Sequence, residues 1–165
     1  MKASTFERLR ELWALGDPSQ VAGREIFDAI KNDRRPGWAA NILEWCAGKF
    51  GEEIDEVRAV IEVAQDDRRW HEAHGVFDRV RGETLRHDRP GQADRKLVAL
   101  LYVAEIAAKV TYNAAGTVAP FDHDSGWWMA RVLHHLVTTL DESEGAEREA
   151  WDLLVAPLRH SARDK

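Results

Sequence analysis

Seven histidines are the side chains in this sequence that most directly suggest metal chemistry. His71 and His74 lie three residues apart, and His134 and His135 are adjacent. If the apolar residues around the first pair face inward, His71 points to the opposite side, whereas the ligands of a metal site in a helical bundle project inward. The order His-Glu-Ala-His also differs from the His-Glu-x-x-His of zinc proteases. We therefore predict no metal site and no other cofactor.

Glu105 is the carboxylate with the most unusual setting, because it interrupts a long apolar run. A charged group in such a run must be paired, protonated or placed at a solvent-facing edge. Lys109 follows four residues later, in the favourable Glu-to-Lys order on a helix, so a local ion pair is the simpler interpretation. The alternative is a buried acid in a ligand pocket that also contains Tyr112 and His135.

The segment 120–138 carries the densest group of side chains suited to binding. A helix expected at about 126–140 directs Trp127 outward when Met129, Leu133 and Leu136 face inward. Arg131, His134 and Thr138 then continue the outward stripe at i+4, i+7 and i+11.

An exposed indole beside a guanidinium is typical of a protein-binding hot spot. The predicted interaction residues are Phe121, Asp122, His123, Asp124, Trp127, Arg131 and His134. The competing interpretation is that another helix, or the loop 116–125, covers Trp127.

Signatures of nucleophilic or nucleotide chemistry are missing from the sequence. There is no Gly-x-Ser-x-Gly motif, and Ser125 is explained as a cap for the helix that follows it. No glycine-rich phosphate-binding motif occurs. Cys46 stands among apolar residues, which is typical of a small buried side chain. These observations favour a protein that is not an enzyme.

Charge and hydropathy exclude further classes of function. The formal net charge of −6 argues against a nucleic-acid-binding protein, which needs a basic face for phosphate. The longest apolar run, 97–112, is interrupted by Glu105 and Lys109 and is too short and polar to span a bilayer. The N-terminus has no secretory pattern, and a single cysteine fits a reducing compartment. We therefore expect a cytoplasmic protein that binds neither nucleic acid nor membrane.

Helical periodicity recurs along the whole chain, and no segment shows the alternation of a strand. We predict an all-α fold, with residues 1–165 forming a single-domain bundle of seven to eight helices. The segment at about 92–115 is apolar nearly all round, as expected of the central helix. The segment 82–93 is the clearest polar linker, and Pro157 should kink or end the last helix.

Two classes of function agree with these features. The first is a small acidic protein-interaction module, such as an adaptor, a regulator or an immunity-type inhibitor, that binds another protein through the segment 120–138. The second is an enzyme or small-ligand-binding bundle with a site between the central helix and the segment 120–135. Helical bundles do place ligand sites between facing helices, which keeps the second class open.

The central helix yields a direct test of the predicted architecture. Leu101→Ala should lower the free energy of unfolding by about 2–5 kcal/mol, the usual range for a leucine in a core. Denaturant titration measures this loss. A loss below about 1 kcal/mol would instead indicate a helix at the surface.

Overall fold

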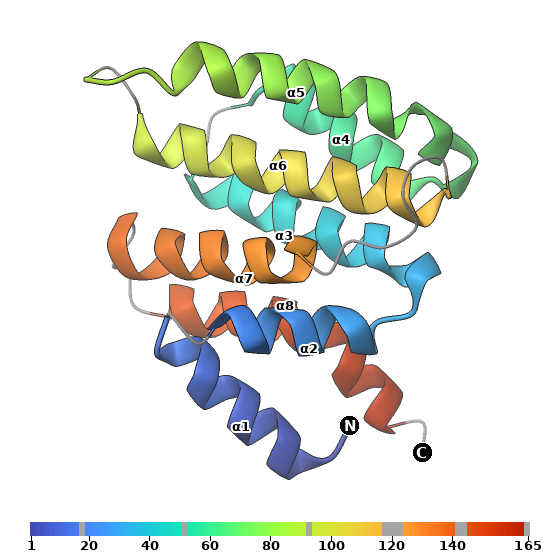
Figure 1. The fold of residues 1–165 in the computed structure, drawn as a ribbon, viewed down its shortest axis with the longest axis vertical. Helices are drawn as coiled ribbons and strands as arrows, with labels where there is room; N and C mark the ends of the chain where they lie inside the picture. The colour runs from blue at the N-terminus through green and yellow to red at the C-terminus, as the bar shows by residue number, and fades with distance from the viewer. Residues whose placement is uncertain (17–18, 51–52, 92–93, 117–123, 141–144, 164–165) are drawn as a thin grey trace. The chain divides into compact units, whose positions relative to one another are not determined.

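The computed structural model describes residues 1–16, 19–50, 53–91, 94–116, 124–140 and 145–163 (Figure 1). All regular structure in these ranges is helical, so the predicted all-α fold is confirmed. Three short helical segments, 32–34, 67–72 and 136–140, accompany the main helices. The eight α-helices of the described residues are α1 (Ala3–Ala14), α2 (Ser19–Ala29), α3 (Arg35–Phe50), α4 (Asp55–Gln65), α5 (Ala73–His87), α6 (Arg95–Ala114), α7 (Asp124–His135) and α8 (Ala146–Arg163).

The chain divides into two compact units. Unit 1 consists of Met1–Arg34 and His123–Lys165, so it joins the two ends of the chain. Unit 2 consists of the continuous stretch Arg35–Asp122. The prediction of one domain over 1–165 stays a prediction.

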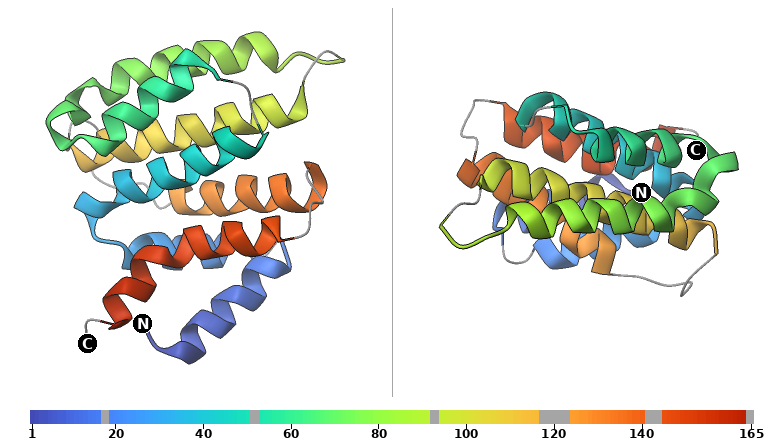
Figure 2. Two further views of the ribbon diagram at one scale, coloured as in Figure 1. Left: turned by 180° about the vertical axis from the view of Figure 1, so that it is seen from behind. Right: turned by 90° about the horizontal axis from the view of Figure 1, so that it is seen from above.

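Helix α6 is the centre of unit 2, where α3 and α5 pack on it from two sides and α4 adds a further contact (Figures 1 and 2). Leu100, Leu101 and Ala104 are fully buried, as the apolar pattern predicted. Asp94 caps the helix, because its carboxylate accepts hydrogen bonds from the backbone N–H groups of Lys96 and Leu97 at 3.1 and 3.2 Å.

The expectation that the run 97–112 is too short and polar to span a bilayer is wrong for the whole of α6, whose length and composition would allow a membrane span. It is the one helix among the described residues that is long and apolar enough, and 67% of that apolar stretch is buried inside the structure. Burial of this kind is typical of the core helix of a soluble protein.

In unit 1, helices α2 and α7 run side by side in opposite directions (Figures 1 and 2). Their backbones meet at Gly23 and Gly126. A Cβ atom on Gly126 would lie 2.5 Å from the carbonyl oxygen of Gly23, and a Cβ atom on Gly23 would lie 2.9 Å from the Cβ of Ala130. Only glycine allows an approach this close.

Trp13 of α1 fills the core of unit 1 beside this contact. Its ring is fully buried, and its Nε1–H donates to the carbonyl of Ala130 at 3.2 Å. Trp151 of α8 lies against it with ring centroids 5.7 Å apart. The Arg10 guanidinium lies 5.5 Å from both ring centroids and pairs with Glu147, which connects α1 to α8.

Two local predictions differ from the structure. Helix α5 continues through Gly82 to His87, so the predicted linker at 82–93 begins only after that helix. Thr84 is buried on its inner face, and Glu83 pairs with Arg86 at 2.7 Å, so packing and charge keep this polar segment helical. Helix α8 continues through Pro157, so of the two predicted alternatives the end of the helix is wrong, whereas a kink agrees with the bend of α8 toward its C-terminal end (Figure 2).

The glycine contact predicts an unusual sign for a routine substitution. Gly→Ala inside a helix normally stabilises it, and Gly82→Ala should do so by about 0.5–1 kcal/mol, since nothing lies within 4 Å of the added atom. Gly23→Ala or Gly126→Ala should instead destabilise by about 1–3 kcal/mol, because the new methyl group meets backbone atoms. Thermal and denaturant unfolding of the three variants measure the difference. Equal stabilisation of all three would show that α2 and α7 do not touch.

Candidate functional site

The predicted interaction segment contributes to a compact surface cluster on unit 1. We call it the tryptophan–arginine patch, and it consists of Arg24, Asp124, Trp127, Trp128 and Arg131. The rings of Trp127 and Trp128 lie 4.6 Å apart at an angle of 37°. The guanidinium carbons of Arg24 and Arg131 lie 5.9 and 5.8 Å from the centroid of Trp127, within the range of cation–π attraction. Arg24 also pairs with Asp124 at 3.4 Å.

The side chain of Trp127 is less exposed to solvent than the helical spacing of α7 predicted. It is half-buried, and the more exposed indole is that of its neighbour Trp128, at 44%. The physical reason is the close approach of α2, which brings Arg24 toward the ring of Trp127. No periodicity within one helix reveals a neighbour that comes from a hundred residues earlier in the sequence.

The indole N–H of Trp127 is a buried donor without a hydrogen-bond acceptor among the described residues. Buried indole N–H groups normally have an acceptor, and leaving one without it costs about 1–3 kcal/mol. This position of Trp127 is therefore less favourable than its packing alone indicates.

His134 belongs to the core of unit 1 more than to the patch. Its ring meets Trp13 edge to face at 5.2 Å, and it is half-buried. Burial lowers the pKa of His134 below its ordinary value of 6.5. Asp124 and Arg131 are exposed, whereas Phe121, Asp122 and His123 lie outside the described residues.

The alternative ligand site is not assembled within either unit. Glu105 and Tyr112 lie on α6 in unit 2, and His135 is an exposed residue of α7 in unit 1. Tyr112 packs against the rings of His74 and Phe77, with centroids 5.3 and 5.7 Å away.

Glu105 is a buried acid, with 7% of its surface exposed. One carboxylate oxygen accepts a hydrogen bond from Nη1 of Arg81 at 3.2 Å, and the other accepts one from the hydroxyl of Thr84 at 2.7 Å. Both partners come from α5, whereas the sequence suggested the local neighbour Lys109. Pairing with α5 makes Glu105 a polar connection between two helices of unit 2.

Other side chains with potential chemistry are dispersed. Among the described residues, no group of three or more His, Cys, Asp or Glu side chains is arranged to hold a metal ion. His71 is exposed, and His74 lies 3.6 Å from Asp78. Burial raises the pKa of the Cys46 thiol to about 12, so this cysteine is a poor nucleophile.

The setting of His134 predicts a pH dependence of stability. Because its pKa is lower in the folded state, the unfolded chain binds the proton more tightly, and the free energy of unfolding should fall as the pH drops below about 6.5. His134→Gln should remove this part of the decline, whereas His135→Gln, on the exposed side of the same turn, should retain it. Denaturant titrations between about pH 7.5 and 5 measure the slopes. An unchanged slope in His134→Gln would contradict the assignment.

Comparison with known proteins adds no relative from which a role can be transferred. No protein-family model, no curated protein and no solved structure matches the chain. The function is therefore argued from the side chains of the two units.

Proposed function

We propose that this chain is a small protein-interaction module, acting as an adaptor, a regulator or an immunity-type inhibitor, that binds another protein through the tryptophan–arginine patch. The observation that carries the proposal is the exposed indole of Trp128, which lies against the tilted ring of Trp127 beside two guanidinium groups. Tryptophan and arginine are the residues most enriched at the energetic centres of protein interfaces.

The patch is suited to binding because contacts among its side chains restrict their freedom before a partner arrives. Arg24 and Arg131 are each held near the ring of Trp127, and Arg24 is further oriented by Asp124. Side chains that are fixed before binding lose less conformational entropy when a partner arrives. The N–H of Trp127, which has no acceptor within the described part of the chain, agrees with the same proposal, since such an indole loses no hydrogen bond there when it shifts toward a partner.

The charges of the patch indicate the chemistry of the partner surface. Two guanidiniums stand against the single carboxylate of Asp124, so the patch is locally basic although the chain carries a net charge of −6. A complementary surface offers carboxylates around an apolar centre that covers Trp128. We place the protein in the cytoplasm, in keeping with its single, buried cysteine.

Trp128→Ala should abolish capture of the partner while changing the free energy of unfolding by no more than about 0.5 kcal/mol, as for an ordinary surface change. Affinity capture from the native cell, followed by mass spectrometry, identifies the proteins lost. Leu85→Ala is the matched control, because Leu85 is another large exposed side chain, at 59%, and lies on unit 2.

Two results would contradict the proposal. The first is that the Trp128→Ala variant captures the same proteins as the wild type. The second is that the Leu85→Ala variant fails to capture the same proteins that the Trp128→Ala variant fails to capture. Trp127→Ala serves as a comparison for stability. Because the ring of Trp127 is half-buried, its removal should lower the free energy of unfolding more than removal of the ring of Trp128.

A further inference from the structure

Unit 2 has an open groove at the end where α3 finishes, α4 begins, α5 finishes and α6 begins. Its volume is about 690 Å³, within the range of sites that take small molecules or a few protein side chains. Phe50, Ile54, Leu97 and Leu101 supply its apolar lining. Phe50 and Leu101 are buried, whereas Ile54 and Leu97 remain half-buried, so part of this apolar surface faces solvent.

Carboxylates dominate the polar lining of the groove. Asp55 and Glu56 begin α4 and Glu53 shortly precedes it, and none of the three has a hydrogen bond or ion pair within the described part of the chain. Glu83 and Asp94 complete the set. Glu83 already pairs with Arg86, and Asp94 caps α6.

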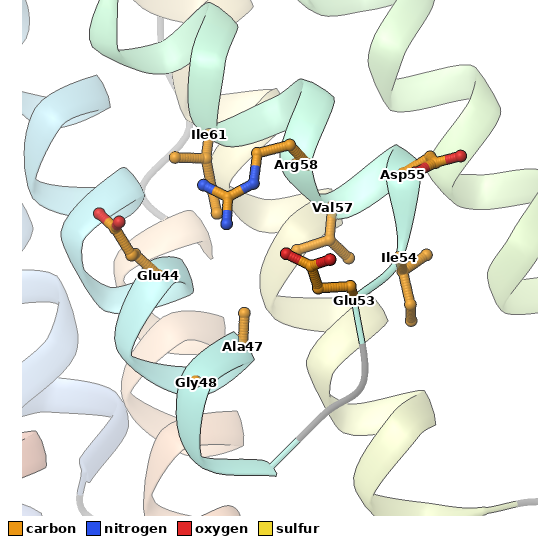
Figure 3. A pocket seen from close by; sticks show the side chains of 9 residues that line it. All are labelled: Glu44, Ala47, Gly48, Glu53, Ile54, Asp55, Val57, Arg58 and Ile61. Carbon is orange, nitrogen blue, oxygen red and sulfur yellow. The ribbon is translucent and has the colours of Figure 1, made fainter.

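The basic groups of the lining do not balance these acids. They are Lys49 and His87. His87 lies 3.5 Å from Glu83, and the Lys49 ammonium lies 5.6 Å from the ring centroid of Trp45. Glu53, Asp55 and Glu56 thus line the groove without an ion pair in the described part of the chain, although Arg58 extends toward Glu53 (Figure 3).

Helix stability explains only part of this arrangement. Asp55 and Glu56 in the first turn of α4 interact favourably with the helix dipole. Glu53 precedes the helix, so its interaction with the helix dipole is weaker. The dipole also does not explain why apolar side chains stay accessible between the acids. The combination of an apolar floor and an unbalanced acidic rim is the feature that calls for a ligand.

A smaller hollow lies beside the groove and has a different character. It occupies about 350 Å³ between α3 and α4, and it shares Glu53, Ile54 and Asp55 with the groove. Figure 3 shows Arg58 extending into this hollow toward Glu44 and Glu53, while Asp55 points away from it. The Arg58 guanidinium partly offsets the negative charges of Glu44 and Glu53 in this hollow. The larger groove is therefore the stronger candidate for a cationic ligand.

We infer that the groove docks a basic amphipathic segment of another protein, with lysine or arginine facing the acids of α4 and large apolar side chains seated over Ile54 and Leu97. Charge complementarity selects a cationic partner, and the apolar floor selects one that also carries hydrophobic side chains. This surface lies on unit 2 and is independent of the tryptophan–arginine patch on unit 1.

The test uses the whole chain and three fluorescent synthetic peptides. The first carries Lys residues on one helical face and Leu residues at i, i+3, i+4 and i+7 on the other. The second replaces each Leu by Ser, and the third replaces each Lys by Glu. Fluorescence anisotropy should show binding of the first peptide, with an affinity at least about tenfold above that of the other two.

Matched variants assign the binding to the groove. A first triple variant removes the charges of the groove through Glu53→Gln, Asp55→Asn and Glu56→Gln. Its affinity for the first peptide should be lower than that of the wild type by about tenfold or more. Glu7→Gln, Glu11→Gln and Glu62→Gln together change the net charge equally at exposed sites outside the groove, so they should leave the affinity within about twofold. Circular dichroism melts check that both triple variants are folded.

Several outcomes would overturn the inference. Equal binding of the Leu-to-Ser peptide would indicate attraction of any polycation to an acidic protein. An equal loss of affinity for the first peptide in both triple variants would also indicate attraction of any polycation to an acidic protein. A chain that sediments as a dimer, and becomes a monomer in the groove triple variant, would identify a second copy as the occupant. Failure of this test leaves the Trp128→Ala experiment unaffected, because the two surfaces share no residue.

Discussion

The contact between the backbones of Gly23 and Gly126 positions the side chains of the tryptophan–arginine patch. Two helices with ordinary side chains at this point would lie farther apart. Because they meet through glycine, Arg24 of α2 comes within 5.9 Å of the ring of Trp127 and reaches Asp124 at the start of α7. Ala130, one turn after Gly126, is also close enough to accept the hydrogen bond from Trp13. The core of unit 1 and its most distinctive surface therefore depend on the same contact.

Unit 2 is organised around a different constraint, the burial of Glu105 in an otherwise apolar helix. Arg81 and Thr84 satisfy its carboxylate from α5, which fixes how α5 and α6 face each other. Thr84 also lies 3.0 Å from the carbonyl of Val80, so its position is set by its own helix as well. Loss of either partner would leave a buried carboxylate incompletely satisfied, which is costly in a protein interior.

The two units present surfaces of opposite character. The patch on unit 1 combines tryptophan with two arginines, whereas the groove on unit 2 combines an apolar floor with a lining rich in carboxylates. The net charge of −6 agrees with the acidic groove but gives no indication of the two arginines of the patch. Under the proposed function, different partners, or different parts of one partner, would complement the two sets of charges.

The sequence by itself determined the helical class, the central helix and the inward faces of most helices, because these follow from the spacing of apolar residues along one segment. Leu100, Leu101 and Ala104 are buried where that spacing placed them, as are Met129 and Leu133 of α7 and Leu136 directly after it. Only the tertiary structure decided which side chains meet. Arg24 with Trp127, Arg81 with Glu105, and Trp13 with His134 are pairs from distant segments, and the periodicity of one helix contains no information about its neighbour. The exposure of Trp128 and the half-burial of Trp127 depend on such a neighbour, which is why the segment was predictable as a candidate surface and its exposed residue was not.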